Sequence, residues 1–189
     1  MTKVALWRTL YTPGHDAARL FQAESGWRLE GTAVYSRDGE PSCVRYALEL
    51  GPDWSTRSGS IEGFIGARAI SSRIQRDAQG WTLNGVRQSR VENLVDLDFG
   101  FTPATNHPQL RRMALRRGQS ERITVAWMDA DSEKLEPLPQ VYRRVSEHAY
   151  DYESPQGPYR ATLRIAPSGF VGLYPELWEM ELNVAQTRS

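Results

Sequence analysis

Short alternating runs of apolar and polar residues, separated by turn residues, are the feature that most limits how this chain can fold. Residues 27–36 and 43–50 place apolar side chains at almost every second position, and Asp38-Gly39 lies between them. Similar runs recur about every ten residues, a spacing typical of meanders and barrels. No apolar helical period of ten or more residues is evident. The pattern predicts a mainly β fold: an antiparallel β-roll or incomplete barrel with one or two short helical turns.

Several segments require individual predictions. Residues 15–24 have helical apolar spacing with Asp16 as N-cap, but a strand at residues 18–22, paired with residues 27–36, is favoured by the pattern that follows. Further predictions are a strand at 92–99, a loop at 102–108, a helical turn begun near Pro108, a strand at 113–115, a polar loop at 129–139 and a turn at 154–158.

Length and composition limit the functional classes. The 189 residues suit one domain spanning 1–189, and 40% hydrophobic residues allow a sizeable core. Cys43 is the only cysteine, so no intrachain disulfide forms, and the N-terminus lacks a signal-peptide pattern; both fit a cytoplasmic protein. No run approaches ~18 apolar residues, so we expect no membrane-spanning helix. A net charge of zero argues against a nucleic-acid partner.

Two carboxylates stand in the stretch that is densest in polar groups. Asp96 and Asp98 are two residues apart on a predicted strand, so both face the same side, roughly 6–7 Å apart. Three roles remain open. They pair with arginines such as Arg57, Arg111 or Arg112, they contact a ligand, or they serve a hydrolase as paired carboxylates.

The residues that follow allow similar alternatives. Thr102, Thr105 and Asn106 either satisfy the backbone of their own loop or contact a sugar or phosphate. The six tryptophans either fill the core or line a cavity that takes an acyl chain or stacks on a sugar. Periodicity does not separate these alternatives.

Other reactive side chains show no catalytic or metal-binding spacing. His15, His107 and His148 are scattered, and Cys43 is interpreted as a structural thiol. The chain has neither a nucleophile-elbow pattern nor a glycine-rich phosphate loop. We therefore predict no metal, no cofactor and no catalytic residue.

Several motifs occur in one order along the chain: Trp54-Ser-Thr-Arg57, Asp96-Leu-Asp98, Thr102-Pro-Ala-Thr-Asn106, Arg111-Arg112, Tyr142 and Gly169-Phe-Val-Gly-Leu-Tyr-Pro175. This order resembles a bacterial family of putative glycolipid-binding proteins. The resemblance runs from about residue 27 to residue 175. The family tends to place apolar residues on both sides of the proline in the central motif, where this chain has His107 and Gln109 around Pro108.

The resemblance implies a spiral β-roll with little helix, similar in shape to bacterial carriers that hold lipid inside a curved, incomplete barrel. It implies non-enzymatic binding of a lipid or glycolipid in a concave sheet; the alternatives are a hydrolase using Asp96 and Asp98, or a structural or interaction module without a small ligand. The candidate ligand-binding residues are Trp54, Arg57, Asp96, Asp98, Thr102, Asn106, Arg111 and Tyr142.

Overall fold

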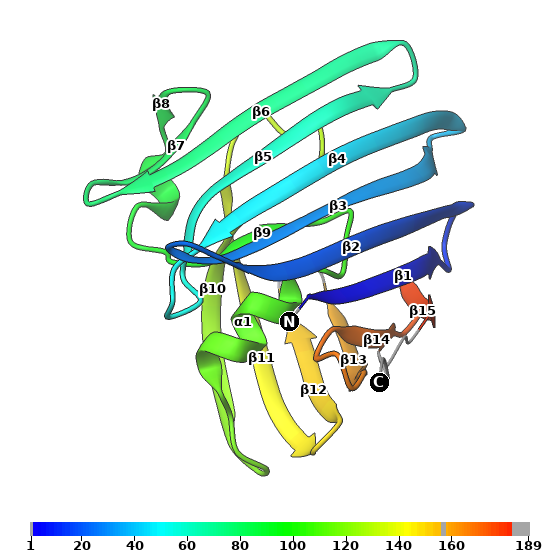
Figure 1. The fold of residues 1–189 in the computed structure, drawn as a ribbon, viewed down its shortest axis with the longest axis vertical. Coiled ribbons are helices and arrows are strands. Elements are labelled where there is room, and N and C mark those ends of the chain that lie inside the picture. The colour runs from blue at the N-terminus through cyan, green and yellow to red at the C-terminus, as the bar shows by residue number, and fades with distance from the viewer. Residues whose placement is uncertain (1, 156–157, 183–189) are drawn as a thin grey trace.

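A computed structural model describes residues 2–155 and 158–182. Within these residues the chain forms one sheet of fifteen strands, one short α-helix and one 3-10 turn. The spatial order is β8-β7-β6-β5-β4-β3-β2-β1-β15-β14-β13-β12-β11-β10-β9. Figure 1 shows the sheet folding over so that its two halves face each other, with the helix between them. The predicted mainly β roll is confirmed.

The element bounds follow the turn residues of the sequence. The first half contains β1 (Lys3–Thr9), β2 (Gly14–Ala23), β3 (Gly26–Arg37), β4 (Glu40–Leu50), β5 (Thr56–Ile65), β6 (Arg68–Asp77), β7 (Gly80–Leu83), β8 (Val86–Arg87) and η1 (Ser89–Val91). The second half contains β9 (Leu97–Phe99), α1 (Asn106–Met113), β10 (Ser120–Met128), β11 (Glu136–Ser146), β12 (Ala149–Ser154), β13 (Tyr159–Ile165), β14 (Val171–Tyr174) and β15 (Trp178–Leu182).

The two halves are joined through β1 and β15, which pair antiparallel near the two ends of the described chain. Every pairing is antiparallel except that of β9 with β10. At the opposite side of the roll, the amide of Thr56 donates to the carbonyl of Val95, 3.0 Å away. The edges β8 and β9 do not pair with each other, so the barrel stays open.

The core lies between the two halves of the folded sheet. Alternate residues of β3 and β4 point inward and are buried, as alternation requires of a strand with one covered face. Gly59 of β5 allows the closest approach: a Cβ there would lie 2.6 Å from Leu97 Cδ2. The indole N–H of Trp7 donates to the carbonyl of Val171 at 2.6 Å and ties β1 to β14.

The strands predicted at residues 18–22 and 27–36 agree with the structure. Residues 15–24 lie almost entirely within β2, which pairs with β3 along its whole length. Asp16 is therefore a buried strand residue rather than a helix N-cap. The tertiary pairing outweighs the helical spacing of a short segment.

The region after residue 92 departs from the prediction. Only Leu97–Phe99 form a strand. Residues 92–96, which follow η1, are irregular. The helix begins at Asn106 rather than at Pro108, and the strand predicted at 113–115 is wrong. Ala114 takes a left-handed conformation with φ 48° and ends the helix there.

The polar loop predicted at 129–139 is too long, because β11 already begins at Glu136. Pro137 and Pro139 pair with β10, whereas the pairing with β12 begins only at Val141. At Pro137 and Pro139, β11 therefore has a neighbouring strand on one side only, and its other side needs no backbone N–H donor. The turn predicted at 154–158 lies partly outside the described residues, since 156–157 are not described.

None of the helices in the described ranges is long and apolar enough to cross a membrane.

Candidate functional site

The predicted ligand-binding residues do not form one site. Asp98, Thr102 and Asn106 line a cleft between the second half of the sheet and the segment before α1. Tyr142 lies fully buried behind it. The remaining four residues are placed elsewhere, and each is described below.

The cleft has a volume of about 200 Å³. Tyr152 and Tyr159 come from the neighbouring strands β12 and β13, and both contact Tyr174 of β14. Trp178 of β15 meets the same tyrosine edge-on at a centroid distance of 5.5 Å. The aromatic lining of the cleft is Phe99, Trp127, Tyr152, Tyr159, Tyr174 and Trp178.

Asp98 closes the polar end of the cleft. The hydroxyl of Thr105 donates to its Oδ1 at 2.6 Å, and the amide of Gln140 donates to its Oδ2 at 2.8 Å. Burial disfavours the charged form and raises the pKa of Asp98 to about 6, although these two hydrogen bonds oppose the shift. No cation pairs with this carboxylate among the residues described.

A second group of hydrogen bonds extends from Asp98 into the core. The amide of Asn106 donates to the hydroxyl oxygen of Tyr142 at 2.9 Å. The same hydroxyl can donate to Gln109 Oε1, 3.0 Å away, or to Gln140 Oε1, 3.2 Å away. Tyr142 therefore holds the start of α1 against β11 and is a structural residue rather than a wall of the cleft.

Thr102 links the cleft to a buried carboxylate that the sequence did not indicate as part of the site. Its hydroxyl donates to Asp16 of β2 and accepts the amide of Ala104. Tyr46 of β4 lies over Gly31 and its hydroxyl is 3.0 Å from both oxygens of Asp16. Burial raises the pKa of Asp16 to about 6. The sequence suggested Asp16 only as a helix N-cap, and its actual partners Tyr46 and Thr102 are distant in sequence.

Asp96 has a different environment from Asp98. Arg112 donates to it through both Nε and Nη2, at 2.9 and 2.7 Å. Of the three arginines considered as partners, the structure therefore selects Arg112. Arg57 is exposed on β5, forms no ion pair with a described residue and does not line the cleft, so its role in ligand binding stays a prediction.

Trp54 and Arg111 lie together, away from the cleft. The guanidinium carbon of Arg111 is 5.3 Å from the centroid of the Trp54 ring. The ring centroid of Trp54 lies 4.5 Å from that of Trp27, which stacks on it, and 5.8 Å from that of His107.

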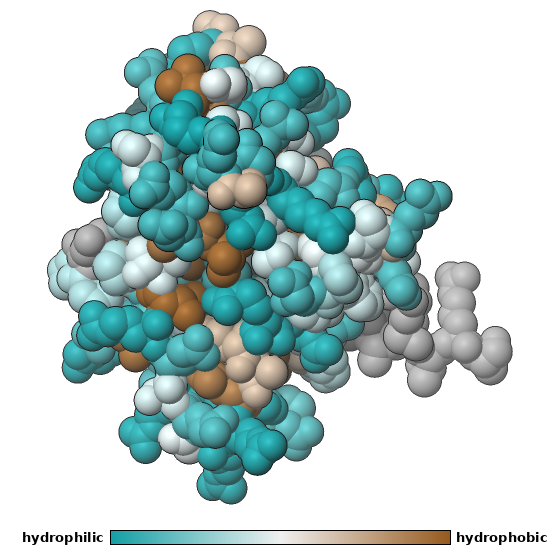
Figure 2. Space-filling view, turned by 90° about the vertical axis from the view of Figure 1, so that its left-hand side faces the viewer, coloured by the Kyte–Doolittle hydropathy of each residue, from teal (hydrophilic) through white to brown (hydrophobic). Residues whose placement is uncertain are grey.

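Figure 2 shows the side of the molecule that carries the loop between β4 and β5, with apolar residues in a band down its middle and polar residues on both flanks.

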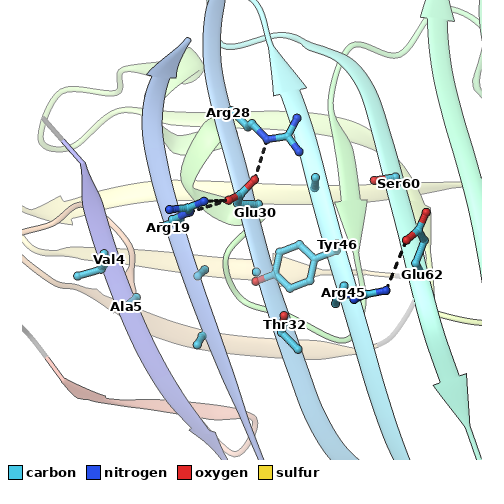
Figure 3. Close-up of a pocket in the computed structure, with 14 residues that line it drawn as sticks. Val4, Ala5, Arg19, Arg28, Glu30, Thr32, Arg45, Tyr46, Ser60 and Glu62 are labelled. Carbon is cyan, nitrogen blue, oxygen red and sulfur yellow. Dashed lines mark hydrogen bonds and ion pairs between the residues drawn. The ribbon is translucent and has the colours of Figure 1, made fainter.

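A larger hollow of about 580 Å³ lies on the outer face of β1–β5. Figure 3 shows its charged side chains turned toward one another, with Glu30 between Arg19 and Arg28 and with Arg45 near Glu62. These groups satisfy each other, and the hollow is open to solvent. Volume alone therefore does not make it the better candidate, and the aromatic cleft fits a small-molecule site better.

Among its lining residues the cleft has no second carboxylate for hydrolysis. Asp98 lines it, whereas Asp96 is 1% exposed and held by Arg112. Glycoside hydrolysis ordinarily requires two carboxyl groups that flank one bond. Among the described residues, no group of three or more His, Cys, Asp or Glu side chains is arranged to hold a metal ion.

Comparisons with known proteins agree with this architecture. A crystal structure of a DUF1089 family protein from Pseudomonas aeruginosa is similar, with a TM-score of 0.75 and 24% identity over 87% of this chain and 91% of that one. This similarity shows the fold. A search of curated proteins found no match. A family profile described as "Putative glycolipid-binding" matches residues 4–180, nearly the whole chain. The chain therefore belongs to this putative glycolipid-binding family.

Proposed function

We propose that the protein binds a lipid or glycolipid non-enzymatically, with part of the ligand in the aromatic cleft. The observation that carries the proposal is the row of tyrosine and tryptophan rings beside Asp98 on the inner side of the roll. Aromatic faces suit both sugar rings and aliphatic chains. The family description names binding of a glycolipid and no catalytic activity, which supports the same proposal.

The size of the cleft limits what it would hold. Its volume of about 200 Å³ is below the ~300–1,000 Å³ typical of ligand sites. We therefore propose that it takes one sugar ring or a short acyl segment, with the rest of the ligand outside. The hydrogen bonds of Asp98, Thr102 and Asn106 are largely used within the protein, so the aromatic walls would supply most of the contact.

Titration with n-octyl β-D-glucoside below its micelle concentration tests the proposal by NMR. We expect saturable shifts at cleft residues, and Trp127→Ala should weaken binding about tenfold through lost contact. Trp27→Ala is the matched control, because Trp27 is equally a half-buried tryptophan but stacks on Trp54 outside the cleft.

The control variant should bind like the wild type. Shifts that do not saturate, or that respond equally to both tryptophan variants, would contradict binding in the cleft. Such a result would favour a structural or interaction module without a small ligand.

A further inference from the structure

A group of cationic and aromatic side chains lies where β1, α1 and the turn at residues 167–169 meet. A Cβ built on Gly169 would lie 3.2 Å from Nδ1 of His107 and 3.5 Å from Nζ of Lys3. The same turn thus places the ammonium group beside the imidazole. Arg111 follows His107 by four residues on α1, so the two share a helix face.

Neither cation has a carboxylate partner among the described residues. Ten other arginines form ion pairs within this part of the chain, but neither Lys3 nor Arg111 does. Burial, and then the charge of Arg111, lowers the pKa of Lys3. Two like charges held together without a partner destabilise the fold unless an anion joins them.

His107 is an independent observation that points to a ligand at this group. The residue is fully buried, yet neither ring nitrogen has a hydrogen-bond partner. A buried polar group without a partner costs about 1–3 kcal/mol, so such groups call for an explanation. The hydroxyl of Ser168, in the same turn, is also buried without a partner.

We propose that Lys3, Arg111 and His107 form a binding site for a phosphoryl group. A guanidinium fork and a compact ammonium charge are the pair of donors that phosphate oxygens favour, and one neutral imidazole N–H adds a third donor. The Trp54 ring beneath Arg111 restricts the guanidinium group. The proposal does not rest on ligand binding in the aromatic cleft, because the two sites use different side chains.

The imidazole offers a direct test by NMR. Inorganic phosphate is titrated at constant pH and compared with sodium chloride at equal ionic strength. The Cε1–H signal of His107 should move saturably with phosphate alone, while the signals of the exposed His15 and His148 serve as references. No change of the His107 signal beyond the chloride effect would overturn the proposal.

Variants separate a defined site from general charge attraction. Lys3→Gln and Arg111→Gln should each weaken phosphate binding about tenfold or more. Arg122→Gln is the matched control, since it removes an exposed arginine that has no ion pair among the described residues and should leave the affinity unchanged. Equal loss in all three variants would overturn the proposal.

A soluble lipid identifies the source of the phosphoryl group. Dihexanoyl phosphatidic acid that binds more tightly than phosphate, with the same dependence on Lys3 and Arg111, would indicate a lipid headgroup. Equal affinities would indicate a free phosphate or a soluble phosphate ester. Trp127→Ala should change neither affinity for the phosphoryl group, so failure of the cleft proposal and failure of this one are distinguishable.

Discussion

At Asp98 the protein buries a carboxyl group among hydroxyl and amide donors, without a cation beside it. Asp16 is held in the same way by Tyr46 and Thr102. Burial raises the pKa of both groups to about 6, so each is close to its protonation midpoint near neutral pH. Asp96, two residues from Asp98, instead has the charge of Arg112.

Replacement of Asp98 should change how stability depends on pH. Its pKa is raised in the folded state, so its contribution to stability is fully present below the ordinary value of 3.8 and is lost as pH rises through about 6. Relative to the wild type, Asp98→Asn should gain up to about 3 kcal/mol between pH 4 and pH 7. Urea unfolding of both proteins at each pH measures the difference.

The comparison with a variant is needed because another group acts in the opposite direction. Burial lowers the pKa of His107 to about 3, so its contribution is present above the ordinary value of 6.5 and is lost as pH falls. The two effects partly cancel in the wild type. A stability difference between Asp98→Asn and the wild type that stays constant with pH would contradict the buried, titrating carboxyl.

The ion pair of Asp96 with Arg112 leads to a second prediction. The Asp96 side chain is 2% exposed, so Arg112→Ala would leave a buried charge without its partner. We expect a loss of about 3–5 kcal/mol in the free energy of unfolding. Arg116→Ala removes a nearby exposed arginine and should cost less than about 0.5 kcal/mol. Chemical denaturation checks both; equal losses would contradict a stabilising ion pair.

Sequence reasoning at the residue scale found the carboxylates and named Arg112 among the possible partners of Asp96, but it missed the partners of Asp98. The pairing of a carboxylate with an arginine was one of three open roles, and the structure assigns it to Asp96 alone. Asp16 and Gln140 were missed because their partners lie far along the chain. Short-range spacing contains no information on such contacts.

At the scale of elements, β9 and α1 determine how the roll is filled. β9 is only three residues long, yet its Leu97 and Phe99 reach the bare backbone of Gly59 on β5. α1 then places Asn106 toward the cleft network and Arg112 toward Asp96. A glycine on one strand thus allows a short strand on the other half of the sheet to pack closely.

Gly59→Ala should therefore destabilise the protein. The added Cβ would meet Leu97 Cδ2 at 2.6 Å and Leu48 Cδ2 at 3.1 Å, and the overpacking should cost about 1–3 kcal/mol. Gly172→Ala is the control, because its nearest atom would be 3.5 Å away. Thermal unfolding that shows equal effects would contradict the close approach of β9 to β5.

Alternation located the long strands well, whereas the short elements were predicted poorly. The strands of residues 14–50 pair over ten or more residues, and period two is visible in each. The segment at 92–99 contains the same alternation, but tertiary packing retains only three residues as strand. The helix was predicted to begin near Pro108 because proline suits the first position of a helix, whereas Asn106 and His107 are weak helix formers and gave no earlier start signal.

For the whole molecule, the folded sheet creates both candidate sites. The rings of the cleft come from β9, β10 and β12–β15, and the phosphoryl site lies where β1, α1 and the turn before β14 meet. The family resemblance predicted the open roll, which the structure confirms. It did not predict that Trp54 and Arg111 would lie away from Asp98, Thr102 and Asn106, because this separation depends on how α1 crosses the roll.

Native mass spectrometry of the protein purified from its natural host tests the central claim most directly. We predict that the wild type carries an additional mass matching a lipid or glycolipid, and that Trp127→Ala loses this mass while Trp27→Ala retains it. A wild-type protein that carries no such mass, or an adduct that persists unchanged in Trp127→Ala, would contradict ligand binding in the aromatic cleft.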